Sequence, residues 1–180
     1  MFGCCNAFFS CRCGSYCCGS DASGGVPPTP VPPSPFPPVT PPSPPRLRGM
    51  QLSLVGSSAG SVVHGDCVDF DAVNSNNTLG LSYTPGSGSI TISRTGTYLV
   101  NWWVAVENTQ TTEMLAFAAS LNGSDVATSY SDIGGGQIYG TAIVNVSSIP
   151  ATLSLVNRSA GDVTLATAGV QAGLTVTQLA

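Results

Sequence analysis

Hydrophobic and polar residues alternate with a period of two over much of the chain from residue 50 to residue 180. The clearest case is the segment 97–108, TYLVNWWVAVEN, which we predict to be a strand because successive strand side chains point to opposite faces. Both faces of this segment are largely apolar, so we expect it to be covered on both sides, by two packed sheets or by a sheet and a neighbouring subunit. One face would carry Tyr98, Val100, Trp102, Val104 and Val106, and the other Leu99, Asn101, Trp103, Ala105 and Glu107.

Eight further segments have the length and composition of strands, and turn-forming residues separate them. No segment shows the amphipathic stripe of a helix. Short strands at this spacing predict an all-β fold, an antiparallel sandwich of the jelly-roll kind. The strand-like segments are 50–55, 67–70, 89–93, 114–121, 139–147, 151–157, 162–167 and 173–179, and the turns are 84–89, 93–96, 121–125, 132–137, 148–150 and 158–162.

The composition divides the chain into three parts: a cysteine-rich N-terminal connector at 1–25, a proline-rich spacer at 26–49, and the strand-rich domain at 50–180. Twelve of the fourteen prolines lie between Pro27 and Pro45. Such a density of proline favours the polyproline II conformation, in which this segment would reach about 60 Å. We interpret it as a semi-rigid linker; the alternative is a ligand for aromatic-lined grooves.

Charged residues make up only 8% of the chain, against about 25% in ordinary soluble domains, and all five basic residues are arginines. Residues 1–49 carry three arginines and one aspartate, a net charge of +2, whereas residues 50–180 carry two arginines and eight acids, a net charge of −6. This asymmetry favours head-to-tail contact between copies, and the absence of a basic stripe excludes a nucleic-acid partner. Because β proteins usually protect their sheet edges with lysine, we expect neighbouring copies to cover the edges of this one.

No targeting segment is evident. The first residues lack the basic region of a signal peptide, and Asn6, Ser10 and Arg12 interrupt their apolar run, so we expect neither a signal peptide nor a membrane span. The six clustered cysteines nevertheless indicate a disulfide framework, which is typical of an oxidising or extracellular setting. We therefore expect the protein to leave the cell by a route other than ordinary secretion.

Several phrases of the strand-rich domain resemble the C-terminal globular domain of the collagen-like glycoproteins of bacterial spore exosporia, most specifically ISRTGTYLV at 92–100 and LTVTQL at 174–179. Those domains are trimeric jelly rolls similar to tumour necrosis factor and the globular head of the complement initiator. The resemblance covers residues 50–180 and implies a compact homotrimer on a spore surface. Upstream, this chain has no Gly-X-Y repeats; its short connector and spacer are instead similar in layout to the subunits of endospore appendages, in which the leader of one trimer attaches to the next.

The cysteine spacing of the connector does not form two C-x-x-C knuckles, so zinc binding is poorly supported. Adjacent cysteines rarely bridge each other, and each pair would send its sulfurs to different partners. We expect intersubunit disulfides through Cys4, Cys5, Cys11, Cys13, Cys17 and Cys18, with Phe2, Phe8, Phe9 and Tyr16 as apolar anchors that seat the connector. The alternatives are indiscriminate cross-linking to coat proteins and, with less support, lipidation.

The remaining candidates lie in the strand-rich domain. Cys67 is either a buried free thiol or the acceptor of a disulfide from another subunit, and Tyr98, Trp102 and Trp103 are expected in the core of the sandwich or of the trimer. His64 and Cys67 would face opposite sides of a strand, so we expect no catalytic residues and no enzyme. The acids at 66, 69 and 71 lack the spacing of a calcium loop, and we expect no metal or cofactor.

We conclude from the sequence that the chain is a structural subunit of a spore-surface filament, in which homotrimers join head to tail through disulfide-locked connectors. It would reach the spore surface on lysis of the mother cell. Its partners would be further copies of itself and spore-coat or exosporium anchor proteins. The alternative is an anchored display or adhesion trimer at a fibre tip or on the exosporium, and a third class is a soluble ligand-type trimer.

Overall fold

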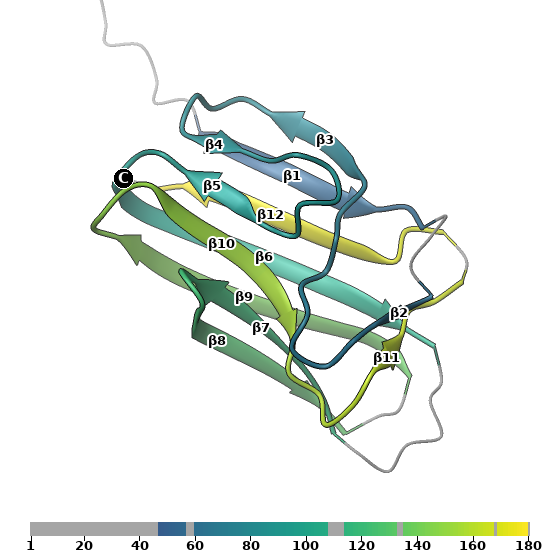
Figure 1. Ribbon diagram of the computed structural model, residues 1–180. Coiled ribbons are helices and arrows are strands. Elements are labelled where there is room, and N and C mark those ends of the chain that lie inside the picture. The colour runs from purple at the N-terminus through teal and green to yellow at the C-terminus, as the bar shows by residue number, and fades with distance from the viewer. Residues whose placement is uncertain (1–46, 57–59, 108–113, 133–134, 168, 180) are drawn as a thin grey trace, which may run out of the picture. The chain divides into compact units, whose positions relative to one another are not determined.

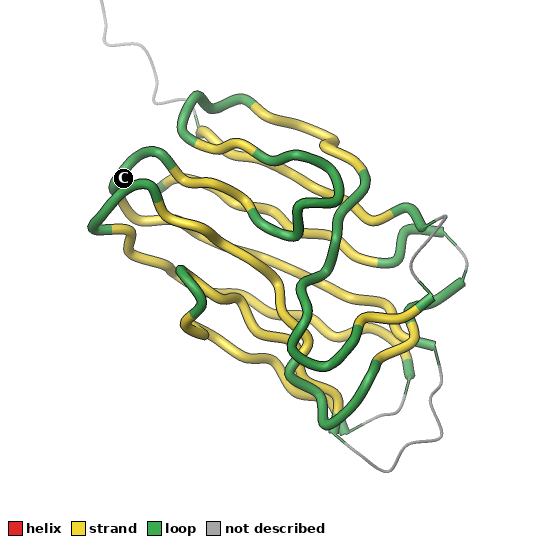
Figure 2. The backbone as a smooth tube through the Cα atoms, viewed as in Figure 1, coloured by secondary structure: helices red, strands yellow, loops and turns green. Residues whose placement is uncertain are grey.

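The computed structural model describes residues 47–56, 60–107, 114–132, 135–167 and 169–179. All regular secondary structure within these ranges is β-strand (Figure 1, Figure 2). The strands pair antiparallel in two five-stranded sheets and one two-stranded sheet, which confirms the expected all-β jelly-roll sandwich. We find no helical segment in these ranges that would span a bilayer.

The first sheet has the strand order β3-β1-β12-β6-β9. β6 and β9 are its longest strands, with 11 residues each, and they pair from Gly96 opposite Val146 to Val106 opposite Gly136. β9 therefore forms one edge of the sheet. The strands are β1 (Arg48–Leu54), β3 (Ala72–Asn76), β6 (Gly96–Val106), β9 (Gly136–Val146) and β12 (Ala172–Gln178).

The second sheet has the strand order β4-β5-β10-β7-β8. A tight turn at Asn122 and Gly123 joins β7 to β8, and both residues have positive φ angles, of 51° and 81°, as the common two-residue hairpin turn requires. The strands are β4 (Leu81–Ser82), β5 (Ile90–Ile92), β7 (Leu115–Leu121), β8 (Ser124–Ser131) and β10 (Ala151–Asn157); the two-stranded sheet consists of β2 (Ser61–Val62) and β11 (Val163–Thr164).

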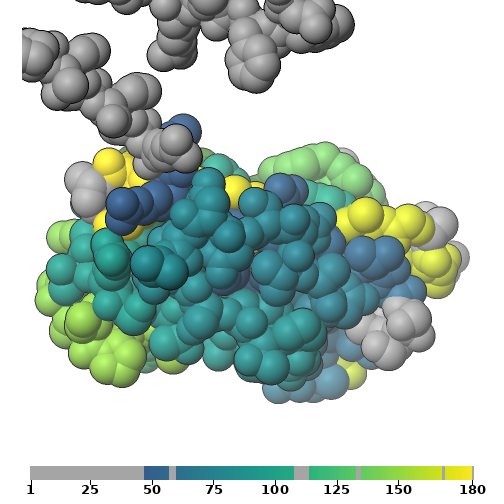
Figure 3. Space-filling model, turned by 90° about the horizontal axis from the view of Figure 1, so that it is seen from above, coloured from purple at the N-terminus to yellow at the C-terminus, as the bar shows by residue number. Residues whose placement is uncertain are grey.

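The hydrophobic core lies between the two five-stranded sheets. Alternate residues of each strand fill it, and the inward side chains of β6 and β7 such as Val100 and Phe117 are completely buried. Each large apolar side chain buried in this way contributes about 1.5–3 kcal/mol to folding. The hydroxyl of buried Tyr98 donates a hydrogen bond of 2.8 Å to the backbone oxygen of Arg94, so its polar group is satisfied. Figure 3 views the domain from the side on which the β3–β5 region lies, and atoms of this region cover most of the visible face.

Two predictions about single segments, one strand and one turn, were wrong. The segment 67–70 is a loop that crosses between the sheets, and its only β-type pairing is an isolated bridge between Cys67 and Val156. Its apolar residues Val68 and Phe70 are buried in the core, which is why the segment has the pattern of a strand. The turn expected at 121–125 is shorter, and β8 begins at Ser124. β8 escaped detection because its sequence, SDVATSYS, is mostly polar.

The sandwich has two ends at which its loops gather (Figure 2). We call the end at which β1 begins the proximal end and the other the distal end. β1 and β10 run from the proximal to the distal end, as does β6, whereas β9 and β12 run the opposite way (Figure 1). The proximal end comprises the described residues 47–49, 77–80, 93–96, 122–123, 147–150 and 178–179, and the distal end comprises 55–56, 60–66, 107, 132, 158–162 and 169–171.

Candidate self-association site

One face of the first sheet points away from the sandwich core. Burial alternates along β6 and β9, so every second residue of these strands lies on this face. We call it the outer face. On β1, β12, β6 and β9 it consists of Gly49, Gln51, Ser53, Thr97, Leu99, Asn101, Trp103, Ala105, Gln137, Tyr139, Thr141, Ile143, Asn145, Gly173, Thr175 and Thr177.

None of these outer-face residues is charged. Surfaces that stay in water are usually about 25–35% Lys, Arg, Glu and Asp. The outer face also exposes large hydrophobic side chains on β9: Tyr139 is 64% exposed and Ile143 is 71% exposed. An uncharged surface with apolar residues at its edge strand is typical of a protein–protein contact.

Trp103 lies near the middle of the outer face. It is opposite Gly173 of β12, and a Cβ atom at Gly173 would approach the Trp103 Nε1 atom to 2.4 Å. The indole ring therefore lies across the backbone of β12, where only glycine leaves room for it. Packing against the backbone fixes the orientation of this ring, which suits a contact residue because little side-chain freedom is lost when a partner binds.

A pocket of about 620 Å³ opens beside Trp103. In its wall the Thr141 hydroxyl donates a hydrogen bond of 2.7 Å to Asn101 Oδ1, and the Tyr139 hydroxyl donates one to Gln137 Oε1. The lining contains no acid, base or thiol that could act in catalysis, so the pocket can offer shape, apolar contact and amide or hydroxyl hydrogen bonds. It is lined by Asn101, Trp102, Trp103, Ser129, Tyr139, Gly140, Thr141 and Thr175.

The structure separates the two adjacent tryptophans. Trp102 is 2% exposed and belongs to the sandwich core with Tyr98, whereas Trp103 is half-buried on the outer face. Trp102 Nε1 is buried without a hydrogen-bond partner among the described residues. Sequence analysis placed all three aromatic residues in one class, because alternation alone does not tell the core face from the interface face of a strand with two apolar faces.

Tyr139 and Ile143 were not among the candidate residues. Their strand was predicted, since 139–147 alternates with a period of two. The signal that would have singled them out is the pair of large apolar side chains on the otherwise polar face of this strand, because core strands bury one apolar face and leave the other to water.

The candidate connector residues lie outside the described residues: Cys4, Cys5, Cys11, Cys13, Cys17, Cys18, Phe2, Phe8, Phe9 and Tyr16. Cys67 is described; it is partly exposed and forms no disulfide with another described residue. Its acceptor role stays a prediction.

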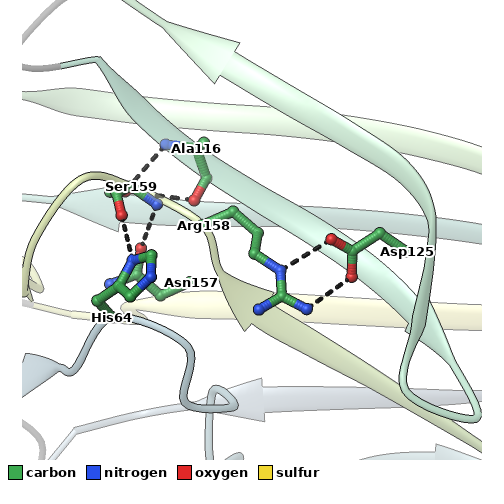
Figure 4. Close-up of polar contacts among 6 residues, drawn as sticks. All are labelled: His64, Ala116, Asp125, Asn157, Arg158 and Ser159. Carbon is green, nitrogen blue, oxygen red and sulfur yellow. Dashed lines mark hydrogen bonds and ion pairs between the residues drawn. The ribbon is translucent and has the colours of Figure 1, made fainter.

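His64 and Asp71 make hydrogen-bonding contacts with the protein backbone. The His64 ring nitrogen Nδ1 lies 2.5 Å from the backbone oxygen of Ser159 (Figure 4), and Asp71 accepts hydrogen bonds of 2.9 and 3.2 Å from the backbone of Val55 and Gly56. Among the described residues, no group of three His, Cys, Asp or Glu side chains is placed to hold a metal ion.

Figure 4 shows the polar contacts that hold the distal ends of β7 and β10. Asn157 is completely buried, and its side chain donates to the backbone oxygens of Val62 and Gly161 and accepts from the backbone of Ser159. Beside it, Arg158 donates two hydrogen bonds, of 2.8 and 2.9 Å, to the Asp125 carboxylate of β8. This hydrogen bonding lowers the pKa of Asp125 and raises that of Arg158. These contacts join the end of β10 and the loop after it to β2 and to β8.

No family model and no curated protein matches the sequence. Solved structures do match the fold. Murine APRIL superposes with a TM-score of 0.56 at 14% identity, over 74% of this chain and 100% of that chain. Eiger TNF from S. frugiperda superposes with a TM-score of 0.52 at 14% identity, over 74% and 93% of the two chains. The globular domain of zebrafish complement 1qA superposes with a TM-score of 0.51 at 10% identity, over 73% and 95%. The described domain therefore has the jelly-roll fold that TNF and the C1q globular domain share.

Proposed function

We propose that the chain is a structural subunit of a spore-surface filament. Three copies associate through the outer face into a homotrimer, and the N-terminal connector of each trimer attaches covalently to the next trimer through Cys4, Cys5, Cys11, Cys13, Cys17 and Cys18. The proline-rich spacer links the connector to the jelly roll, whose first strand begins at Arg48. The filament forms outside the cell, on the spore surface, after the mother cell lyses.

The observation that carries the trimer is the uncharged outer face with exposed Tyr139 and Ile143. Four strands about 4.8 Å apart, two of 11 residues and two of 7, give this face an area of roughly 600 Å². Stable interfaces bury about 800 Å² on each partner, so the face can supply the larger part of a specific contact. The resemblance to trimeric jelly rolls, noted from the sequence phrases, supports three copies as the number.

Two features support the growth of trimers into a filament: the cysteine-rich connector, and the end of the jelly roll to which the chain joins it. The described chain begins at the proximal end, where Arg48 pairs with Gln178. The residues that precede Arg48, among them the connector, are therefore joined covalently to this end of the jelly roll. A contact between the end of one trimer and a different surface of the next does not close on itself, so it produces a filament.

The test is electron microscopy of the full chain after oxidation, beside a chain that lacks residues 1–25. We expect filaments from the full chain and discrete trimers from the truncated chain. Replacing the six connector cysteines by serine gives a matched control: the filaments of this variant should fall apart on dilution, whereas those of the unchanged protein should not. Filaments of the truncated chain that persist on dilution, or monomers from either chain, would contradict the proposal, and discrete full-length trimers would favour an anchored display trimer.

A further inference from the structure

The two ends of the sandwich carry opposite charges. At the proximal end, Arg48 and Arg94 are both exposed, and neither forms an ion pair with a described residue. No described residue of this end is an aspartate or glutamate. The two arginines line one pocket of about 380 Å³ together with Leu47, Asn77 and Leu79. Leu47 is 72% exposed and Leu79 is 92% exposed, so the pocket presents both cations and uncovered apolar side chains.

The distal end carries exposed carboxylates. Glu107 follows the last residue of β6 and Asp132 follows the last residue of β8, and both strands end there (Figure 1). Asp66 and Asp162 lie in the loops beside the end of β10, where the Asp66 backbone oxygen accepts a hydrogen bond from Asn157. The arginine of this region, Arg158, is already engaged by Asp125. The four carboxylates at positions 66, 107, 132 and 162 therefore leave the distal end with an excess of negative charge.

We propose that the distal end of one jelly-roll trimer docks directly on the proximal end of the next, with the carboxylates of positions 66, 107, 132 and 162 facing Arg48 and Arg94. The occupant of the leucine-flanked arginine pocket is thus a second copy of this chain. This inference rests on the proposed trimer and filament, and it adds to them the contact that aligns successive jelly rolls. It also fixes the polarity of the filament, because like ends repel.

Three features of the chain favour this occupant. The opposite signs of the two ends make head-to-tail contact attractive and both end-to-same-end contacts repulsive. Leu47 and Leu79 supply apolar area that stays in water unless a partner covers it. Residues 1–49 carry a net charge of +2 and residues 50–180 a net charge of −6, so the N-terminal segment of one copy is also attracted to the acidic domain of another.

Direct docking has a geometric consequence. A strand of 11 residues is about 36 Å long, so with its loops the jelly roll is roughly 40 Å long. Docked ends therefore predict an axial repeat of about 40 Å, with the spacer folded inside or alongside the joint. If the extended spacer separated the jelly rolls instead, the repeat would be about 100 Å.

The test uses full-length protein under reducing conditions, so that connector disulfides do not mask the contact. One variant, Arg48→Glu/Arg94→Glu, reverses the charge of the proximal end, and another, Asp66→Arg/Glu107→Arg/Asp132→Arg, reverses that of the distal end. Sedimentation velocity at about 20 mM and about 500 mM salt reports the association of trimers. We expect either variant alone to weaken association by about tenfold or more at low salt, and high salt to weaken association of the unchanged protein.

Rescue is the decisive measurement. A mixture of the two variants, or the chain with all five substitutions, restores opposite charges at each joint and should restore association at low salt. Loss of association in either variant without rescue, or association that is unchanged by all five substitutions, overturns the docking. An axial repeat near 100 Å in oxidised filaments overturns it as well. In those cases intact trimers and connector-dependent filaments would still uphold the proposed function, whereas the absence of trimers would remove both proposals.

Discussion

Gly140 of β9 lies opposite Trp102 of β6, and a Cβ atom at Gly140 would approach the Trp102 indole to 2.1 Å. The ring of Trp102 occupies the space that a side chain at position 140 would need. A second pair repeats this relationship on the other side of the sheet, where Gly173 of β12 makes room for Trp103. One glycine thus serves the core and the other serves the outer face.

Replacing Gly140 by alanine should destabilise the fold. The added methyl group would force Trp102 or Ser129 to move in a packed region, which costs about 1–3 kcal/mol. Chemical denaturation of the truncated chain 47–180 measures this change. Gly173→Ala is the matched control: it moves Trp103 on the outer face, so it should weaken trimers more than it weakens folding. Equal effects of the two substitutions on both measurements would contradict this division of roles.

Replacing Ile143 by lysine should dissociate the trimer. The side chain is 71% exposed in the single subunit, so the subunit itself should remain folded, whereas in the trimer the ammonium group would be buried without a partner. Sedimentation and circular dichroism together measure this outcome. Tyr130→Lys is the control, because Tyr130 is 62% exposed on β8 of the other sheet. Trimers that persist in the Ile143 variant, or that are lost in the Tyr130 variant, would show that a different surface associates.

The ion pair between Arg158 and Asp125 should make stability fall in acid. The hydrogen bonds from Arg158 lower the pKa of Asp125, so the folded state favours the ionised carboxylate. Its contribution is present above the unfolded pKa of about 4 and is lost as the pH falls through the lowered folded pKa. Asp125→Asn should remove this part of the acid dependence. Because both side chains are about one-third exposed, the loss at neutral pH should be less than about 1 kcal/mol.

Tyr98, which is buried, and Tyr83, which is partly buried, should make stability fall in alkali. Burial raises the pKa of Tyr98 and of Tyr83, so the folded state favours the neutral form of each phenol. This contribution is complete below the unfolded pKa of about 10 and is lost as the pH rises through the raised folded pKa. Tyr98→Phe should therefore flatten the alkaline decline, although it loses the hydrogen bond to Arg94 and about 1 kcal/mol at neutral pH. A decline as steep as in the unchanged protein would contradict this assignment.

Asn157→Ala should be strongly destabilising. It would leave two buried backbone groups and one partly buried one without their partner, at a cost of about 3 kcal/mol. Asn74→Ala is the control, since exposed Asn74 accepts a single hydrogen bond of 2.7 Å from Ser53. Thermal unfolding compares the two. Because Asn157 is completely buried, its N-x-S sequon should also resist glycosylation in the folded protein.

The strands that build the core could be predicted because each combines a clear alternation with apolar residues. β6 and β12 are the best examples, since burial in the core imposes the same period on sequence and structure. β3 and β8 could not be predicted, because the residues of edge strands such as AVNSN and SDVATSYS satisfy pairing without an apolar face. The segment 67–70 was mistaken for a strand because Val68 and Phe70 alternate as strand residues do, but they do so in a loop that crosses the core.

The two proposed association surfaces were harder to predict than the fold. Trp103 was among the candidate residues, but the face to which it belongs could be defined only when the pairing of β6 with β9 and β12 was known. The charge separation could not be seen at all in the sequence of the domain. Asp66, Glu107, Asp132 and Asp162 are far apart along the chain, and only the direction in which each strand runs brings them to one end.

The pairing of β1 has a mechanical consequence. Its seven residues form a register with β12 from Arg48 opposite Gln178 to Leu54 opposite Ala172, and β3 pairs with its other edge. Tension in a fibre would enter the jelly roll at Arg48 and pull β1 along its own length, so the ladders on both sides would be loaded in shear and would have to rupture together. A spore appendage built from such units would resist stretching by flow or by attachment to surfaces without unravelling one hydrogen bond at a time.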